Sequence, residues 1–213
     1  MQQDRPRLAR FPDCTGVLVA GGAASRLGGI PKGLLRIAGE PIVARSLRLF
    51  ADVFAGSMIV ANEAAPYAAF GAPVVPDAIA GKGAPGGLHA ALSASRTPWV
   101  FTAACDMPFL SADPIAWLAQ RRDGAPAVAV IWKGRLEPLH AFWSRACLPT
   151  IEAMLRGGDP SMWAIATAVG ARMVNEEEWR EVDPAGRAFA NVNTPEDAAR
   201  LGVNFISASG TAG

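Results

Sequence analysis

Short apolar runs bounded by turn residues recur along the first half of the chain. Continuous apolar runs of this length are typical of strands that are covered on both faces of a sheet. They lie at Gly16–Ala20, Ser57–Ala61, Pro73–Val75 and Trp99–Ala104. Helix-length segments separate them, and these cover Pro41–Phe50, Pro85–Ser95 and Ala112–Gln120, the last with Ser111 as a candidate N-cap. This alternation predicts a parallel sheet with right-handed crossovers, in which ligands bind at the carboxyl ends of the strands.

The pattern changes in the second half of the chain. The short glycine-containing connection Lys133-Gly134-Arg135 joins two apolar runs, Ala127–Trp132 and Leu136–Trp143, which predicts a β-hairpin. Helices around Arg145–Leu155 and Ser161–Val169, a strand at Ala171–Val174 and a last strand near Phe189–Val192 complete the prediction. The fold class is therefore α/β: a single-domain, Rossmann-like, doubly wound and mostly parallel sheet with a hairpin excursion.

Domain limits and cellular location follow from length and composition. The 213 residues contain no linker-like segment, so we predict one domain over 13–204, with flexible tails at 1–12 and 207–213. A net charge of +1 gives no general reason to bind nucleic acid or an acidic membrane surface. No apolar run has the roughly 18 residues of a membrane span, and no signal core follows the amino-terminal arginines, so we expect a cytoplasmic protein.

The first predicted strand runs directly into a glycine-rich loop. Val19 and Ala20 end the strand, Gly21 and Gly22 follow, and the cations Arg26 and Lys32 come after them. Glycines let a backbone approach a ligand closely, and the cations suit phosphate groups. The spacing is neither that of a Walker A loop nor that of a dinucleotide fingerprint. A glycine-rich loop with a distant lysine is instead typical of nucleotidyltransferases, although the segment is also compatible with a plain turn.

Two aspartates stand where predicted strands end. Asp106 follows Trp99–Ala104, and Asp77 follows the short strand that ends at Val75. Mg²⁺ prefers one or two carboxylates together with phosphate oxygens and water, so Asp106 is a candidate metal ligand. Each aspartate is also compatible with an ordinary role in a turn.

A third group of polar residues precedes a predicted helix. Thr194 as N-cap, Pro195 at the first helical position and Asp197 at the third make a strong helix start. The helix start does not explain Asn191 and Asn193. One residue separates these two asparagines, so from a strand end their side-chain oxygens could point to the same metal ion or phosphate. We therefore treat Asn193 as a candidate second metal contact.

Taken together, these motifs resemble those of the molybdenum cofactor guanylyltransferase family. The ordered set is Val19-Ala20-Gly21-Gly22 with Arg26 and Lys32, then Asp77, Cys105-Asp106-Met107-Pro108, and Asn191-Val192-Asn193-Thr194-Pro195-Glu196. The resemblance implies GTP and Mg²⁺ as cosubstrate and metal, and molybdenum-bound molybdopterin as acceptor. It also implies molybdopterin-delivering proteins and molybdoenzyme apoproteins as candidate partners.

The same resemblance implies roles for individual residues. The backbone of Val19 to Gly22 would contact the nucleotide, Lys32 and Arg26 would act on its phosphates, and Asp106 would hold Mg²⁺. Asp77 would hold the guanosine part, with Asn62 as a further nucleotide contact. Because the loop Gly83-Ala84-Pro85-Gly86-Gly87 departs from the G-P-L-x-G pattern of the family, cytidylyl transfer to the same pterin stays an alternative. Sugar-1-phosphate nucleotidyl transfer and a non-catalytic nucleotide-binding regulatory domain are further alternatives.

Overall fold

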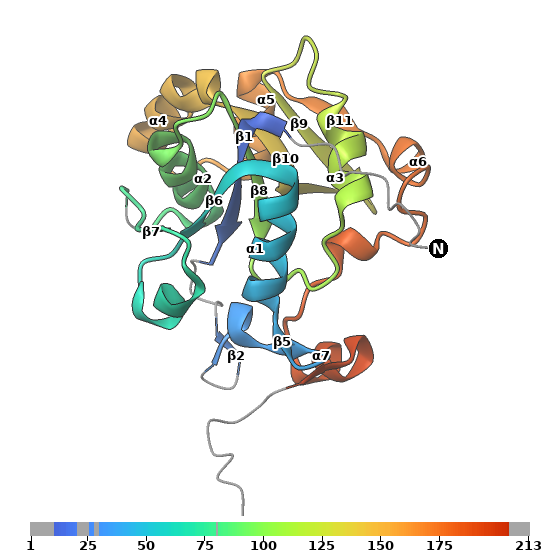
Figure 1. The fold of residues 1–213 in the computed structure, drawn as a ribbon. Helices are drawn as coiled ribbons and strands as arrows, with labels where there is room; N and C mark the ends of the chain where they lie inside the picture. Colours follow the sequence, from blue (N-terminus) through green and yellow to red (C-terminus); the bar gives the residue numbers. More distant parts are fainter. Residues whose placement is uncertain (1–10, 21–25, 28–29, 80, 205–213) are drawn as a thin grey trace, which may run out of the picture.

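A seven-stranded, mostly parallel sheet forms the centre of the molecule. The computed structural model describes residues 11–20, 26–27, 30–79 and 81–204. The strand order is β11-β9-β10-β8-β1-β6-β7 (Figure 1), and β10 is the strand of this sheet that runs antiparallel to its neighbours. The strands are β1 (Phe11–Val19), β6 (Phe54–Val60), β7 (Val74–Val75), β8 (Trp99–Ala104), β9 (Ala127–Trp132), β10 (Arg135–Ser144) and β11 (Arg172–Val174). The predicted parallel sheet with one hairpin is confirmed.

Helices cover both faces of this sheet. They are α1 (Ile42–Val53), α2 (Gly83–Ala94), α3 (Ala112–Ala119), α4 (Leu148–Gly157), α5 (Met162–Val169), α6 (Glu176–Trp179) and α7 (Pro195–Leu201). Apolar residues of α1, α3 and α6 join one buried cluster, and those of α2, α4 and α5 join another. Successive β1 residues serve the two clusters in turn, since Leu18 belongs to the first and Val17 and Val19 to the second. This alternation is the period of two expected of a strand buried on both faces.

The first strand is longer than predicted, and a close contact explains the glycine within it. β1 begins at Phe11, whereas the sequence pattern predicted Gly16–Ala20. A Cβ atom built on Gly16 would lie 2.6 Å from the ring of Phe50 and 2.7 Å from that of Phe54. Glycine therefore lets α1 pack directly against the centre of the sheet.

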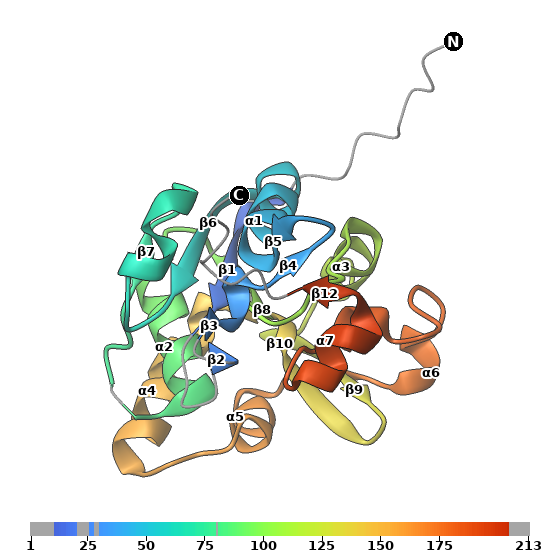
Figure 2. The same ribbon diagram turned by 90° about the horizontal axis from the view of Figure 1, so that it is seen from below.

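A second, smaller sheet lies near the carboxyl ends of the central strands. It has the order β12-β4-β5 and combines β12 (Val203–Asn204), β4 (Arg36–Ile37) and β5 (Glu40–Pro41). Figure 2 shows this sheet together with α7, and a third apolar cluster contains Leu35 and Ile42 with Val192, Ala198 and Val203. The short pair of β2 (Arg26–Leu27) and β3 (Ile30–Pro31) precedes it.

The strand predicted near Phe189–Val192 is wrong. The segment begins with the 3-10 helix η4 (Arg187–Phe189) and then continues without regular structure up to α7. The side chain of Asp183 accepts hydrogen bonds from the backbone N–H groups of Arg187 (2.9 Å) and Ala188 (2.8 Å). These bonds stabilise a turn, because they satisfy backbone donors that a strand would present to a neighbour.

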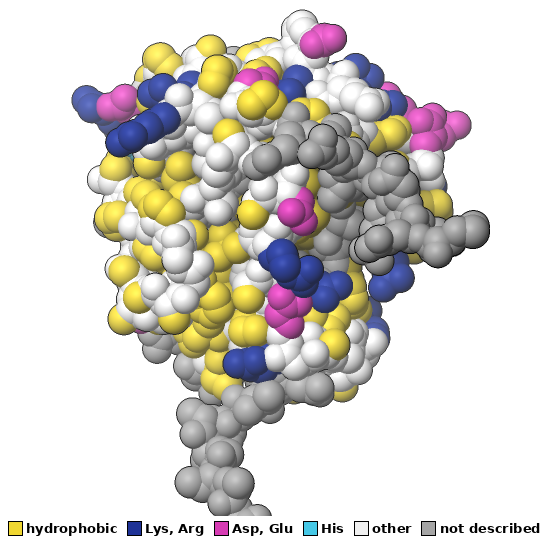
Figure 3. All heavy atoms as spheres, viewed as in Figure 1, with side chains coloured by type: hydrophobic (Ala, Val, Ile, Leu, Met, Phe, Trp, Pro, Cys, Tyr) yellow, Lys and Arg dark blue, Asp and Glu magenta, His cyan; other side chains and the backbone are white. Residues whose placement is uncertain are grey.

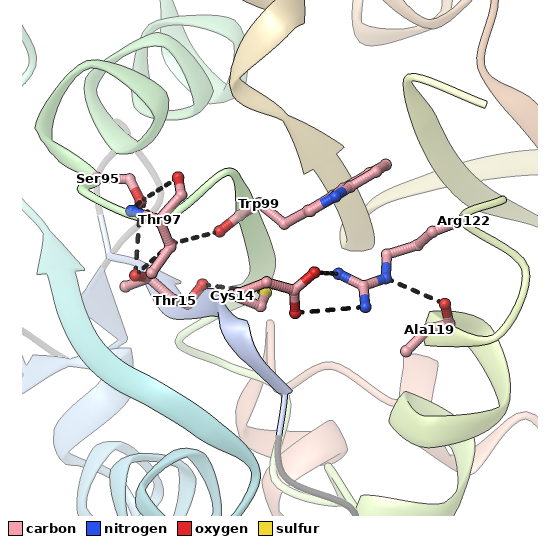
Figure 4. Close-up of polar contacts among 8 residues, drawn as sticks. Cys14, Thr15, Ser95, Thr97, Trp99, Ala119 and Arg122 are labelled. Carbon is pink, nitrogen blue, oxygen red and sulfur yellow. Dashed lines mark hydrogen bonds and ion pairs between the residues drawn. The ribbon is translucent and has the colours of Figure 1, made fainter. Parts of the chain in front are cut away.

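Polar side chains bond to one another at the amino ends of the central strands, where β1 and β8 begin. The hydroxyl of Thr97 lies 2.7 Å from that of Thr15 and 2.9 Å from that of Ser95, and Arg122 donates to Asp13 at 3.0 Å (Figure 4). Asp13 and Arg122 also line a cavity of about 640 Å³ at this edge, but each already has the other as its partner. Asp13 and Arg122 therefore contribute to stability at this end of the molecule.

The face that carries α1 mixes charges of both signs (Figure 3). On it, Arg48 of α1 pairs with Glu40 at 2.8 Å, and Arg45 lies 3.7 Å from the same carboxylate. Within the described residues, no helix has the length and apolar character that crossing a membrane requires.

Candidate functional site

Most of the predicted site residues lie at the carboxyl ends of the central strands, which we call the carboxyl edge of the sheet. β1 lies between β6 and β8, and the chain leaves each of these strands at this edge. Ala20 donates its N–H to Val60 at 2.8 Å, and the N–H of Cys105 donates to Val19 at 3.1 Å. Asn62 follows β6, Asp77 follows β7 and Asp106 follows β8. The topology thus brings four strand ends together, as the doubly wound pattern predicts.

Lys32 is the central charged group of this edge. It begins the 3-10 helix η1 (Lys32–Leu34) and is 5% exposed. Its Nζ donates to Asp106 Oδ2 at 3.1 Å and to Asn193 Oδ1 at 2.6 Å. Burial of an ammonium is costly unless it is paired, and these two oxygens supply the pairing. An ammonium has three donors, so the two contacts hold Lys32 in place and use two of them.

The start of α7 positions Asn193. Asp197 Oδ2 accepts from the backbone N–H of Asn193 at 3.1 Å and from that of Thr194 at 3.2 Å, while Thr194 Oγ1 accepts from Asp197 N at 3.1 Å. This reciprocal capping box is the helix start that the sequence predicted. These hydrogen bonds, and that of Asp197 with Arg200, keep the pKa of the Asp197 carboxyl below its usual value. The backbone N–H of Val192 donates to Asp106 O at 3.1 Å, which ties the segment to the loop after β8.

Asn62 and Asp77 form a second polar pair at the same edge. Asn62 Oδ1 accepts from the backbone N–H of Asp77 at 2.9 Å, and Asn62 Nδ2 donates to Asp77 Oδ2 at 3.2 Å. Asn62 follows β6 and Asp77 follows its parallel neighbour β7, and Asn62 is exposed. The amide therefore orients the aspartate, whose other carboxylate oxygen has no hydrogen-bond donor among the described residues.

The donor set around Asp106 bears on the predicted metal site. Among the described residues, no group of three or more His, Cys, Asp or Glu side chains is placed to hold a metal ion. A single carboxylate, with a side chain 15% exposed, nevertheless fits Mg²⁺, which retains water and takes phosphate oxygens as ligands. The oxygen that the sequence analysis offered from Asn193 is already occupied by Lys32.

Two titratable groups near this edge are packing residues. Burial, helped by the charge of Asp106, raises the pKa of the Cys105 thiol to about 12, so this cysteine is not a reactive thiolate. His140 is fully buried, and neither of its ring nitrogens has a hydrogen-bond partner. The rings of Phe101, Trp179 and Phe189 surround it at centroid distances of 5.1 to 5.5 Å. Desolvation lowers the pKa of His140 to about 3, although the charge of Asp183 opposes this effect.

The structure brings together Lys32, Asp106 and Asn193, and separately Asn62 and Asp77. Val19 and Ala20 lie at the end of β1, and both are buried. Gly21 and Gly22 lie outside the described residues, and for Arg26 only the backbone, within β2, is described. Asp183, which shapes the segment before Asn193, was not among the predicted site residues. The turn-forming series Asp183-Pro184-Ala185-Gly186 was the available signal for it.

Comparison with known proteins adds a family to this geometry. The family model described as the MobA-like NTP transferase domain matches residues 16–173. A protein of Pelotomaculum thermopropionicum named probable molybdenum cofactor guanylyltransferase is 33% identical over 189 residues, which cover 89% of this chain and 92% of that protein. The molybdenum cofactor guanylyltransferase of Cupriavidus pinatubonensis is 35% identical over 196 residues, with 87% and 94% covered.

Solved structures share the fold. The molybdopterin-guanine dinucleotide biosynthesis protein A of Archaeoglobus fulgidus aligns with a TM-score of 0.73 at 24% identity, over 88% of this chain and 95% of that one. The 2-C-methyl-D-erythritol 4-phosphate cytidylyltransferase of Thermus thermophilus aligns with a TM-score of 0.63 at 18% identity, over 87% and 96%. The α/β architecture is thus one that nucleotidyltransferases with different acceptors use.

Proposed function

The chain belongs to the family of MobA-like NTP transferase domains, and from this we propose that it is a molybdenum cofactor guanylyltransferase. It transfers GMP from GTP to molybdenum-bound molybdopterin, and forms the guanine dinucleotide cofactor and pyrophosphate. The names of relatives that align over most of their length support this assignment.

The observation that carries the proposal is the contact of Lys32 with Asp106 and Asn193. A lysine 5% exposed is held at the carboxyl ends of the central strands, beside Asp106 after β8. Its fixed position lets its charge act on phosphate oxygens without reorganisation during the reaction.

The reaction needs positioning and charge neutralisation more than an activated side chain. An oxygen of the acceptor's terminal phosphate attacks the α-phosphorus of GTP, a new P–O bond forms, and the bond to the β-phosphate oxygen breaks. Pyrophosphate leaves with the electron pair of that bond. Lys32 and Arg26 stabilise the charge on the phosphates, and correct alignment of the two phosphates lowers the barrier.

Asp106 is the residue that would hold Mg²⁺, and the ion would neutralise phosphate charge as pyrophosphate departs. Asp106 also pairs with Lys32, so it orients the lysine whether or not the ion is bound. For Asn193, the described geometry supports the role of holding Lys32, and the role of second metal ligand stays a prediction.

The pair of Asn62 and Asp77 is suited to the nucleoside end of GTP. Asp77 offers a carboxylate that Asn62 orients, and carboxylates accept hydrogen bonds from ribose hydroxyls or from the N–H groups of a base. The backbone of Val19, Ala20, Gly21 and Gly22 would contact the nucleotide between this pair and Lys32.

Calorimetric titration with GTP, CTP, ATP and UTP, each with and without Mg²⁺, tests this function. We expect preference for GTP and tighter binding with the metal. In Asp77→Ala, GTP binding should weaken about tenfold or more, which is the loss of one charge-assisted hydrogen bond. Asp52→Ala changes an exposed aspartate of α1 and serves as the matched control.

The outcomes separate the alternatives. Preference for CTP would favour cytidylyl transfer to the same acceptor. GTP binding without pyrophosphate release in the presence of molybdopterin would favour a regulatory nucleotide-binding domain. Absence of binding to any of the four nucleotides would reject the proposed function.

A further inference from the structure

A cavity of about 560 Å³ lies beside the Lys32 contact. The hairpin of β9 and β10 forms one wall, and the segment from Ala185 to Leu201, which includes α7, forms the other. Figure 2 shows α7 next to this hairpin. Asn193 lines the cavity and also accepts from Lys32. The cavity therefore shares Asn193 with the Lys32 contact, and neither Asn62 nor Asp77 lines it.

Two side-chain acceptors of the residues that line this cavity have no hydrogen-bond donor among the described residues. The Oδ1 atom of Asn191 is buried without a hydrogen-bond partner. The half-buried Glu137 also lines the cavity, and its carboxylate has no hydrogen bond or ion pair with any other described residue. Unpaired buried acceptors cost free energy, and most buried polar groups of folded proteins are satisfied. The partly exposed carboxylate of Glu137 is thus explained by a ligand that brings N–H donors, whereas Oδ1 of Asn191 is too buried for such a ligand to reach.

The rest of the lining suggests the shape and charge of that ligand. Trp132 and Phe189 lie at a centroid distance of 5.6 Å, and both line the cavity, which suits a flat ring. Three exposed cations, Lys133, Arg135 and Arg200, also line it, which suits an anionic group attached to the ring. The combination fits a heterocycle with N–H donors along one edge and a negative charge elsewhere.

We propose that Glu137 is a specificity-determining residue, which accepts hydrogen bonds from the 2-amino-4-oxopyrimidine edge of the acceptor's pterin within this cavity. A carboxylate is complementary to two neighbouring N–H groups. The inference rests on the proposed function for the identity of the acceptor. Guanine carries the same edge, but the base of GTP is placed by the proposed function at Asn62 and Asp77.

Protonation of Glu137 should make pterin binding depend on pH. Burial raises the pKa of Glu137 to about 7, although the charge of Arg135 opposes this effect. The charged groups that line the cavity with it are Lys133, Arg135, Asp197 and Arg200. N–H donors favour the ionised carboxylate, so pterin should bind more tightly as the pH rises toward about 7. Below that pH, binding should release a proton.

The test is titration of the full chain, saturated with GTP and Mg²⁺, with three probes. Pterin carries the 2-amino group, lumazine replaces that group with an oxo group, and GMP reports whether a guanine competes for the cavity. We expect pterin to bind and lumazine to bind at least tenfold more weakly. Glu137→Gln should weaken pterin binding about 10- to 100-fold and remove its pH dependence. GTP affinity should not change in this variant.

Glu177→Gln is the matched control, because Glu177 is an exposed residue of α6 that does not line the cavity. Proton release can be measured on the unaltered protein, by calorimetry in two buffers of different ionisation enthalpy, so the test does not depend on a variant that folds. Equal binding of pterin and lumazine, or the same pterin affinity in Glu137→Gln, would overturn the proposal. GMP that displaces pterin would assign the cavity to a guanine instead. In each case retained GTP binding would leave the proposed function standing, whereas its absence would reject that function first.

Discussion

The ion pair of Lys32 with Asp106 contributes both to the stability of the fold and to the proposed reaction. Their side chains are 6% and 15% exposed, so removal of one charge leaves the other poorly solvated. Breaking a buried pair in this way costs about 3 kcal/mol or more. The same contact places a cation and a candidate metal ligand at the phosphate-binding edge. Substitution here should therefore reduce both stability and transfer.

We predict that Asp106→Asn lowers the rate of Mg²⁺-dependent transfer about 100- to 1000-fold, because it removes electrostatic stabilisation of the phosphates. The variant should stay folded, and its free energy of unfolding should fall by about 3 kcal/mol. Pyrophosphate release measures the first effect and urea unfolding the second. Asp52→Asn on α1 should change neither quantity. Unchanged turnover in Asp106→Asn would remove this residue from the metal site.

His140 should make the protein sensitive to acid. Its pKa is lowered from 6.5 to about 3 by burial, so the unfolded chain takes up a proton that the folded chain does not. The resulting loss of stability begins as the pH falls below about 6.5 and reaches about 2 kcal/mol near pH 5. Glu137 acts in the opposite direction, because its pKa is raised by burial to about 7 and it gains a proton more readily when folded.

The measurement compares His140→Leu with the unaltered protein, so that the contribution of Glu137 cancels. Urea unfolding at about pH 7.5 and about pH 5 should show that the variant loses about 2 kcal/mol less on acidification. Equal losses in the two proteins would show that His140 does not stay neutral in the folded state.

At the scale of elements, local signals explain which predictions succeeded. The hairpin was predicted from the glycine in the short connection between two apolar runs. In the structure Lys133 and Gly134 adopt positive φ angles of 50° and 73° in the turn between β9 and β10, a conformation that glycine favours. The start of α7 was predicted from its capping residues. Both features depend on residues a few positions apart.

Features that depend on distant contacts were missed. The apolar residues near Phe189 suggested a strand, but Asp183 turns the chain and Phe189 packs on Trp132 and Trp179. The strands β4, β5 and β12 have two residues each, which is too short for a periodic pattern. Lys32 and Asn193 are 161 positions apart. The sequence suggested each as a site residue, but not that one holds the other.

The helix start of α7 gives a prediction at this scale. Thr194→Ala removes the acceptor for Asp197 N and should lower the free energy of unfolding by about 1 kcal/mol. Because the same capping box holds the backbone of Asn193, the variant should also slow transfer, while Thr194→Ser should restore most of both losses. Urea unfolding and pyrophosphate release provide the measurements. Normal turnover in a destabilised Thr194→Ala protein would show that Asn193 does not need this helix start.

The two ends of the central strands differ in what their polar side chains do. The amino-terminal edge pairs its polar groups internally (Figure 4), whereas the carboxyl edge holds Lys32, Asp106 and the pair of Asn62 and Asp77. The two large apolar clusters lie on opposite faces of one sheet. Both clusters are built on the same strands, so unfolding of one face of the sheet also removes the support of the other. We therefore expect the domain to unfold in a single transition.

Nucleotide binding should therefore stabilise the whole molecule rather than one region. At a GTP concentration about 100 times its dissociation constant with Mg²⁺ present, the free energy of unfolding should rise by about 2.7 kcal/mol. For a domain of this size that corresponds to a rise in Tm of about 5 to 10 °C. Lys32→Met should lose most of this rise at the same GTP concentration, because it removes the cation that contacts the phosphates, whereas Lys133→Met at the hairpin turn should retain it. Scanning calorimetry that resolved two transitions, with only one shifted by GTP, would mean that the carboxyl edge unfolds independently of the sheet.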